Sequence, residues 1–328
     1  MKSPHTARVI DRRSFYAYLF LMFFFIGCES QSTHQYIELP LKGQVTDRNE
    51  EISSMTIYND KLVLLPENLN GYIFWLPLHE IEESITRYQY SKIDSLRPRI
   101  SFFRTENYNK TIYGFDGFEA LVIHDDSVYI MIEVKDVRGE AFHMSSFLIW
   151  GSINSESMEV IIPNSNIIRI PTPTQVYNQT FEGMSYHNGK LIIMYEVNGV
   201  NMRIDVWQYI VDVNTIHDDE LVIEFDKLMF PNIEYRVTDM TSVIDNKFWV
   251  TNYFWPGDKE MLQIEDSIGV ERLVEFEIIG DVVVRSNYKP INIPLGEKSR
   301  NWEGVVRYKD GFLISTDKFP KMILGYIR

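Results

Sequence analysis

The sequence predicts an all-β protein, and three observations support this prediction. Of its 328 residues, 14% are aromatic, including 19 Tyr and 20 Phe, and aromatic side chains are enriched in strands. A strand–turn–strand pattern recurs along the chain, whereas helical periodicity is nearly absent outside residues 79–87, which favour a short helix or turn. The composition, 45% hydrophobic and 24% charged, is typical of a well-packed globular protein and excludes a disordered chain.

Five segments of the sequence share one 15-residue frame. Each begins with a short polar or acidic residue, continues as a strand-like stretch and reaches a turn of Asn, Asp or Gly type. A second β-rich run follows the turn, so each segment predicts a β-hairpin. The five segments are residues 53–67, 119–133, 182–196, 239–253 and 303–317.

The segments start 57 to 66 residues apart, which suits one four-stranded blade with loops. We therefore predict a five-bladed β-propeller over residues 36–328. A β-sandwich would have no reason to repeat one hairpin frame five times, and a six-bladed ring would need two blades within one short interval. An orphan strand at residues 36–41 precedes the first segment, and one strand, about residues 322–327, follows the last. Pairing these two strands would close the ring.

The N-terminus has the features of an export signal. Four basic residues precede an apolar run over residues 15–26, which is too short for a membrane core of ~30 Å. The run ends in Gly27 and Cys28, the only cysteine, and resembles a bacterial lipoprotein signal. This resemblance implies that residues 1–27 are removed, that Cys28 carries palmitate and other lipid, and that residues 28–35 tether the protein to a membrane of the cell envelope. The alternative is an ordinary signal peptide with an incidental cysteine.

The charge and the cysteine count exclude other classes. Lys and Arg number 32 against 46 Asp and Glu, a net charge of −14, whereas proteins that bind nucleic-acid polymers need clustered positive charge. A single cysteine excludes an intramolecular disulfide. We expect a monomer.

The repeated acidic residues predict a metal site. The first strand of each propeller blade lines the axis, so the starting residues should surround one mouth of the channel: Ser53, Glu119, Glu182, Asp239 and Glu303. Each hairpin returns to the end where it began, which brings a second set to the same mouth: Glu67, Glu133, Glu196, Tyr253 and Asp317.

Clustered carboxylates repel one another, so either several are protonated or a cation lies among them. Oxygen ligands without His or Cys suit Ca²⁺ better than Zn²⁺, and Mg²⁺, which needs stricter geometry, stays open. The alternative is that these residues merely cap backbone N–H groups of the next blade.

Three motifs resemble those of calcium-activated nucleotidases (apyrases): Glu51-Ile52-Ser53-Ser54-Met55, Gly117-Phe118-Glu119-Ala120-Leu121 and Trp302-Glu303-Gly304-Val305. That family consists of five-bladed propellers whose axial Ca²⁺ is held by Ser and Glu at the blade starts. The resemblance implies that the five starting residues are Ca²⁺ ligands, with Asp239 standing where the family has Ser. Residues 301–320 are also similar to the last blade of phytase-type esterase-like propellers.

A bound ion could support hydrolysis of a phosphoanhydride or an ester, because it would polarise the substrate oxygen and lower the pKa of a bound water. The candidate bases for the water proton are Glu133, Glu196 and Asp317. Candidates to bind a small anionic substrate are Arg236, Arg300 and Lys318, which could equally be surface charges. Tyr253 and Trp255 could form a flat wall for a base or sugar, or could pack between blades.

His124 and His187 occupy equivalent positions near hairpin turns, so we expect them at the opposite end of the channel in structural roles. Nucleophile-elbow, dinucleotide, P-loop and zinc-protease motifs do not occur in the sequence.

Two functions stay open. One is a Ca²⁺-dependent hydrolase, and the other is a non-catalytic envelope protein whose ion locks the ring and whose loops bind a glycan or protein.

Overall fold

The computed structural model describes residues 34–47, 49–68, 71–88, 90, 94–139, 141–197, 208–216, 225–258, 269–294, 300–317 and 322–328. The chain divides into two compact units, Met1–His34 and Gln35–Arg328, and the description below concerns the second. Residues 1–27 and Cys28 lie outside the described residues, so the predicted signal and lipidation site do as well. None of the described helices is both long and apolar enough to cross a membrane.

Most elements are strands, which confirms the all-β prediction, and they form five groups of antiparallel neighbours. Group 1 contains β2 (Ile52–Tyr58), β3 (Lys61–Pro66), β4 (Tyr72–Pro77) and β5 (Arg99–Arg104). Group 2 contains β6 (Phe115–His124), β7 (Ser127–Arg138), β8 (Ala141–Ile153), β9 (Val160–Ile161) and β10 (Ile167–Ile170). Group 3 contains β11 (Phe181–His187), β12 (Lys190–Tyr195), β13 (Gln208–Asp212) and β14 (Phe225–Leu228).

Group 4 contains β15 (Arg236–Met240), β16 (Lys247–Tyr253), β17 (Glu271–Ile279), β18 (Val282–Arg285) and β19 (Ile291–Asn292). Group 5 contains β20 (Trp302–Tyr308), β21 (Gly311–Thr316), β22 (Leu324–Ile327) and β1 (Tyr36–Leu39). Groups 1 and 2 share one nine-stranded sheet, because β5 and β9 pair in parallel at Phe103↔Val160 and Arg104↔Ile161.

The described helices are short. The predicted stretch 79–87 is helical and lies within α2 (Leu78–Tyr88), which contacts β1 and β4. The others are α3 (Tyr108–Thr111), α4 (Val213–Ile216) and the 3₁₀ turns η1 (Gln44–Thr46) and η3 (Pro256–Asp258).

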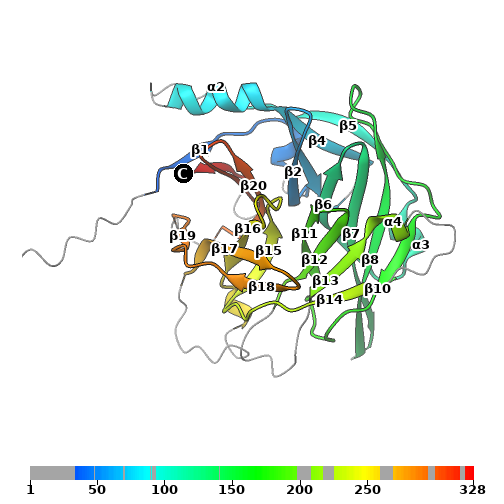
Figure 1. The fold of residues 1–328 in the computed structure, drawn as a ribbon. Helices are drawn as coiled ribbons and strands as arrows, with labels where there is room; N and C mark the ends of the chain where they lie inside the picture. Colours follow the sequence, from blue (N-terminus) through cyan, green and yellow to red (C-terminus); the bar gives the residue numbers. More distant parts are fainter. Residues whose placement is uncertain are drawn as a thin grey trace, which may run out of the picture. The chain divides into compact units, whose positions relative to one another are not determined.

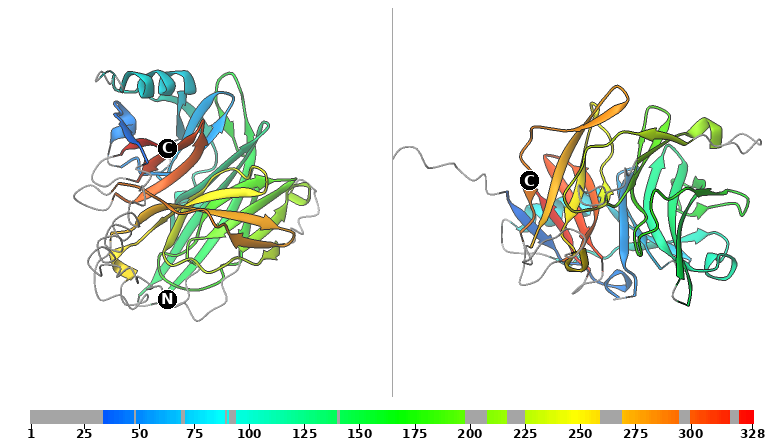
Figure 2. Two further views of the ribbon diagram at one scale, coloured as in Figure 1. Left: turned by 60° about the vertical axis from the view of Figure 1, so that its left-hand side comes forward. Right: turned by 90° about the horizontal axis from the view of Figure 1, so that it is seen from below.

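The N-terminal strand completes the C-terminal sheet, as predicted. β1 pairs antiparallel with β22 from Tyr36↔Ile327 to Leu39↔Leu324. The blue N-terminal strand accordingly lies beside the red C-terminal strands in Figure 1 and in both views of Figure 2. The pairing satisfies the backbone groups of an otherwise open strand edge and brings the two ends of the unit into one sheet.

All five predicted hairpins form, namely β2–β3, β6–β7, β11–β12, β15–β16 and β20–β21. In four of their turns the residues with positive φ are Asn, Asp or Gly, and in the turn between β20 and β21 the residue is Lys309. For example, both central residues of the turn at Asn188-Gly189 have positive φ, 50° and 78°. Asn, Asp and Gly adopt this conformation with little strain, and the resulting turn matches the twist of the two strands.

The five first strands contact one another in a closed series: β2 contacts β6, β6 contacts β11, β11 contacts β15, β15 contacts β20, and β20 contacts β2. Five buried hydrophobic clusters follow the same series, and each joins two consecutive groups. Tyr129 of group 2, for instance, packs in one cluster with Phe181 of group 3. Fully burying a side chain of this size contributes ~1.5–3 kcal/mol, so packing between groups fixes the first strands around a common centre.

Candidate metal centre

A β-bulge turns one residue of each first strand toward a common cavity. The pairing slips by one residue between Ile52 and Ser54, which leaves Ser53 as the extra residue of β2. The same slip occurs at Glu182 in β11 and at Glu303 in β20, and a slip between Phe118 and Leu121 frees Glu119 in β6. These four side chains line one cavity of about 450 Å³, here called the acidic cavity. Bulges commonly redirect side chains in this way beside functional sites.

In the fourth group, Thr238 takes the bulged position that the sequence pattern assigns to Asp239. Pairing passes from Val237↔Asn252 to Met240↔Val250, and then to an isolated bridge Ile244↔Lys247. The register therefore shifts twice between Val237 and the turn. In each of the other four hairpins it shifts once between the residue that precedes the bulged residue and the turn. The additional shift displaces the frame by one residue, and Thr238 lines the acidic cavity.

Asp239 instead binds backbone amides. Its Oδ1 accepts a hydrogen bond from Met240 N and its Oδ2 one from Val305 N of group 5, both at 2.8 Å. The assignment of Asp239 as an ion ligand is therefore corrected, since both of its oxygens serve the backbone. The capping role that the sequence left as an alternative describes this residue.

Glu119, Glu133 and Glu182 form the more buried of two close acidic groups in the cavity. One carboxylate oxygen from each lies within 4.8 Å of the other two. Glu119 and Glu133 are buried, with exposed fractions of 6% and 4%, and Glu182 is partly exposed. Burial raises the pKa of Glu119 well above its usual range, and the charges of Glu182 and Glu133 raise it further.

Burial and nearby negative charges also raise the pKa of the neighbouring carboxylates. Burial raises the pKa of Glu182 and of Glu303 well above the ordinary value, and nearby acids, Glu196 and Asp317 first among them, add to the effect. Burial also raises the pKa of Glu133 and Glu196 to about 7, against the opposing charges of Lys135 and Arg236. A group of acids that resists ionisation in this way is a favourable place for a cation.

The two described cations that line the cavity are engaged in ion pairs. Arg236 donates to Glu196 Oε2 at 2.8 Å and forms two bonds with Asp258, from Nε at 2.7 Å and from Nη2 at 2.9 Å. Lys135 pairs with Asp116 and lies 3.8 Å from Glu133 Oε1. These two charges cannot balance the five acids Glu119, Glu133, Glu182, Glu196 and Glu303, which all line the same cavity.

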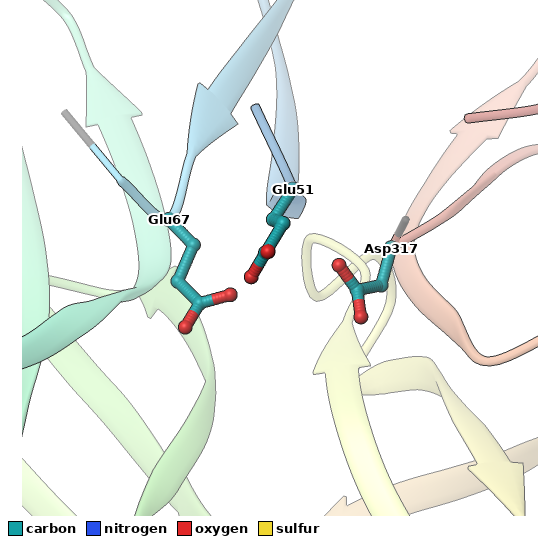
Figure 3. A group of neighbouring side chains, drawn as sticks. All are labelled: Glu51, Glu67 and Asp317. Atoms are coloured by element: carbon teal, nitrogen blue, oxygen red, sulfur yellow. The ribbon is translucent and has the colours of Figure 1, made fainter. Parts of the chain in front are cut away.

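A second acidic group lies at the edge of the cavity. Oxygens of Glu51, Glu67 and Asp317 lie within 4.8 Å of one another, and Figure 3 shows the three carboxylates turned toward a common space. All three residues are partly exposed. Asn301 links this group to the centre, because its Nδ2 donates to Asp317 Oδ2 at 3.2 Å and to Glu303 Oε1 at 2.7 Å.

The three candidate bases all line the acidic cavity, but their surroundings differ. Glu196 uses both oxygens: Oε1 accepts from Thr180 N at 3.2 Å and Oε2 from Arg236. Oε1 of Glu133 is buried and accepts no hydrogen bond within the described part of the chain. Glu133 is therefore better suited than Glu196 to bind an ion or take up a proton.

The candidate substrate contacts separate into three classes. Tyr253 and Trp255 line the cavity, and Trp255 is 45% exposed with the Arg236 guanidinium 4.7 Å from its ring centre. Arg300 lies elsewhere, since it reaches Tyr36 Oη at 3.3 Å and Glu38 Oε2 at 3.4 Å on the outer strand of group 5. Its assignment as a substrate contact is corrected. Lys318 lies outside the described residues.

His124 and His187 line a different cavity, near the hairpin turns, as their position in the repeat predicts. His124 stacks on Tyr186, with ring centres 3.5 Å apart.

Seven lining residues of the acidic cavity went unrecognised in the sequence: Glu51, Asn68, Asp116, Lys135, Asn178, Thr238 and Asn301. Glu51 and Asn301 each lie two residues before a bulged residue, and Arg236 stands in the same relation to Thr238. Residues two apart share one face of a strand, so this spacing could have revealed them. The sequence also carried a signal for the bulged position of the fourth segment, because a large buried apolar residue precedes each bulged residue. These apolar residues are Ile52, Phe118, Phe181, Val237 and Trp302.

No protein-family model matches the chain, and no curated protein sequence matches it. Solved structures do match. One is a glycosyl hydrolase from Bacteroides ovatus, at 9% identity and a TM-score of 0.43 over 85% of this chain and 84% of that one. Another is an exo-1,5-α-L-arabinanase from a bovine ruminal metagenomic library, at 9% identity and 0.43 over 87% and 95%. A third is β-1,2-mannobiose phosphorylase from Listeria innocua, at 10% identity and 0.44 over 89% and 90%. Similarity at this level assigns no activity to the present chain.

Proposed function

We propose that the five strand groups are the blades of a five-bladed β-propeller and that its acidic cavity binds a divalent cation, Ca²⁺. One observation carries the proposal: nine carboxylates line a single cavity in which both described cations are already paired. Like charges at this spacing are unfavourable unless a cation or protons compensate them.

The ligand set would centre on Glu119, Glu133 and Glu182, whose oxygens converge. Glu303 lines the same cavity and would complete the carboxylates. The hydroxyls of Ser53 and Thr238 donate to backbone carbonyls, which leaves their oxygen lone pairs as further ligands. The donor set fits Ca²⁺, which takes six to eight oxygens in flexible geometry, better than Mg²⁺.

The activity that this arrangement supports best is hydrolysis. When bound, the ion would supply Lewis acidity to a substrate oxygen and to a water molecule. Glu133, whose pKa is raised to about 7 by burial, would accept the proton of that water. Because Arg236 and Lys135 are engaged with acids, the described lining favours an uncharged ester over a phosphoanhydride.

Calorimetric titration of the mature protein with Ca²⁺ tests the binding proposal. We expect one site that Glu119→Gln weakens by at least tenfold, whereas Glu83→Gln, an exposed change on α2, leaves it unaltered. Equal affinity in both variants would contradict the ligand set. Turnover of a nitrophenyl ester and of a nucleoside diphosphate, each with Ca²⁺ and with chelator, tests hydrolysis.

A second candidate function is a non-catalytic propeller whose ion holds the blades together. One observation favours it: Glu196 links group 3 to group 4, because its side chain accepts hydrogen bonds from Thr180 N and Arg236 and its backbone carbonyl accepts one from Val237 N. This alternative predicts a chelator-dependent fall in melting temperature without turnover of either substrate.

We also propose that Cys28 is lipidated and anchors the propeller to a membrane of the bacterial envelope as a monomer. Metabolic labelling with a palmitate analogue, compared between the native chain and Cys28→Ser, tests the anchor. Label in both forms, or in neither, would exclude lipidation at Cys28.

A further inference from the structure

Exposed aromatic side chains extend outward from the rim of the acidic cavity. Trp255 lines the cavity and is 45% exposed, and Tyr177, which precedes the lining residue Asn178, is 55% exposed. Phe142 is 38% exposed and packs edge-to-face with Tyr177, with ring centres 5.5 Å apart. We call Phe142, Tyr177 and Trp255 the aromatic strip. Exposed apolar patches of this kind mark binding surfaces.

Arg236 joins the inner part of the strip to the cavity. Its Nη1 donates to the backbone oxygen of Asn178 at 3.2 Å, and its guanidinium lies 4.7 Å from the ring centre of Trp255. Asn178 directly follows Tyr177 in the chain. One buried arginine therefore fixes the backbone beside Tyr177 and the ring of Trp255 at the rim of the acidic cavity.

The outer end of the strip belongs to the β7–β8 hairpin. Phe142 of β8 lies opposite Val137 of β7, which is 46% exposed. Glu133 and Lys135, four and two residues before Val137, line the acidic cavity, and residues two apart share one face of a strand. The strip therefore continues the cavity-facing side of β7 outward, so that an extended ligand held in the cavity also contacts the strip.

The hydrogen-bonding groups of the cavity indicate the chemistry of such a ligand. Nine carboxyl residues line the cavity, and its two described cations are already paired with acids. Ionised carboxylates only accept hydrogen bonds, so the ligand has to donate them. A carbohydrate chain carries many hydroxyl donors, and the C–H faces of its rings suit the large apolar area of aromatic side chains. It therefore matches both the cavity and the strip.

A cationic peptide would also donate hydrogen bonds, but the charges beside the strip disfavour it. The guanidinium of Arg236 already makes the cation–π contact with Trp255. Lys135 lies two residues from Val137 on the same face of β7, and the Ca²⁺ that we propose for the cavity would add positive charge. Because like charges in contact are unfavourable, these groups favour an uncharged ligand.

We propose that the substrate of the acidic cavity is an ester carried by an uncharged carbohydrate chain, and that the chain lies on Phe142, Tyr177 and Trp255. This inference rests on the hydrolysis proposed above and names its substrate class. In the reaction, the acyl carbon gains the oxygen of a water molecule, and its bond to the sugar oxygen breaks. The proton that Glu133 takes from the water passes to that sugar oxygen. The products are a carboxylic acid and a free sugar hydroxyl.

Turnover of partially O-acetylated xylotetraose, cellotetraose and mannotetraose by the full mature chain with Ca²⁺ tests the inference, with nitrophenyl acetate as a small ester that does not extend onto the strip. We expect acetate release from at least one tetrasaccharide. Tyr177→Ala and Phe142→Ala should each raise its KM about fivefold more than the KM for nitrophenyl acetate, because each variant loses one ring contact. Phe102→Ala is the matched control, since Phe102 is 70% exposed on β5 and does not line the acidic cavity. It should leave both KM values unchanged.

Calorimetric titration with the unacetylated tetrasaccharides and with tetralysine separates the possible failures. Turnover of nitrophenyl acetate without binding or turnover of any tetrasaccharide would overturn this inference and leave the proposed hydrolysis in place, as would equal KM changes for both kinds of ester. Tetrasaccharide binding that Tyr177→Ala weakens, without turnover of either ester, would support the carbohydrate on the strip and overturn the hydrolysis. Binding of tetralysine in place of the tetrasaccharides would identify a cationic peptide as the ligand and overturn the inference.

Discussion

Ser53 and Thr238 hold equivalent positions in groups 1 and 4, and each donates its hydroxyl to a backbone carbonyl of a neighbouring group. Ser53 donates to Phe118 at 2.5 Å and Thr238 to Trp302 at 2.6 Å. The next residue in each strand binds the same neighbour, because Ser54 accepts from Leu121 N at 3.1 Å and Asp239 from Val305 N at 2.8 Å. Two matched polar clamps therefore join group 1 to group 2 and group 4 to group 5.

The clamp at Asp239 should contribute to stability and not to cation binding. Asp239→Ala leaves two buried amides, Met240 N and Val305 N, without their present acceptor, which should lower the free energy of unfolding by about 2 kcal/mol or more. Denaturant unfolding measures this change, and calorimetry should find Ca²⁺ affinity within twofold of the native value. Loss of Ca²⁺ binding with unchanged stability would return Asp239 to the ligand set.

Protonation should govern the stability of the cation-free protein. Burial raises the pKa of Glu133 and Glu196 to about 7 in the folded state, from about 4.3 in the unfolded chain. A raised carboxyl pKa contributes stability that is complete below the unfolded value and is lost as pH rises through the folded value. In chelator, the melting temperature should therefore fall from pH 5 to pH 8.

Saturating Ca²⁺ should reduce that fall, because a bound cation favours the ionised carboxylates. Glu133→Gln should also reduce it in chelator by removing one of the titrating groups. A melting temperature that rises between pH 5 and pH 8 in chelator would contradict the assignment of these acids as buried and uncompensated.

Substitution of Arg236 should lower the stability of the protein more than substitution of the other cation that lines the acidic cavity. Its guanidinium pairs with Glu196 and Asp258 while fully enclosed, so Arg236→Met leaves two buried carboxylates without their partner. Removing one member of a buried ion pair costs ~3–5 kcal/mol. Urea unfolding should show a loss of this order. Where the variant folds, Ca²⁺ affinity should increase, because a positive charge near the acids has been removed.

Arg87→Met on α2 provides the comparison. Arg87 pairs with Glu83 and Asp94 at the surface, with all three side chains at least half exposed. Exposed pairs of this kind contribute ~0–1 kcal/mol. Similar losses in the two variants would mean that the burial of the Arg236 pairs has no energetic weight.

Local sequence patterns predicted the hairpins and the closing strand because each depends on a few neighbouring residues. Turn residues with positive φ, such as Asn188 and Gly189, identify a hairpin wherever strand-like runs flank them. The prediction that Asp239 takes the bulged position of the fourth segment was wrong for a physical reason. A second register shift lies between Val237 and the turn, and the turn residues do not reveal a shift within a strand. The prediction that Arg300 contacts a substrate was wrong because its partners, Tyr36 and Glu38, are distant in sequence and belong to the closing strand.

Gly257 should control the position of Trp255 at the rim of the acidic cavity. A Cβ at position 257 would lie 1.9 Å from Cζ3 of the indole, so Gly257→Ala should displace this ring from the Arg236 guanidinium. The lost cation–π contact is worth ~0.5–2 kcal/mol. Trp255 is 45% exposed, whereas Trp150, Trp249 and Trp302 are buried and Trp75 is partly buried, so the part of the acrylamide quenching that Trp255→Phe removes reports on the movement of Trp255. We expect stronger quenching in Gly257→Ala and a reduced quenchable fraction in Trp255→Phe.

Gly183→Ala adds a Cβ with ordinary contacts of 3.4 Å or more and should leave quenching unchanged. Equal quenching of the native chain and Gly257→Ala would mean that the glycine does not hold the indole against Arg236.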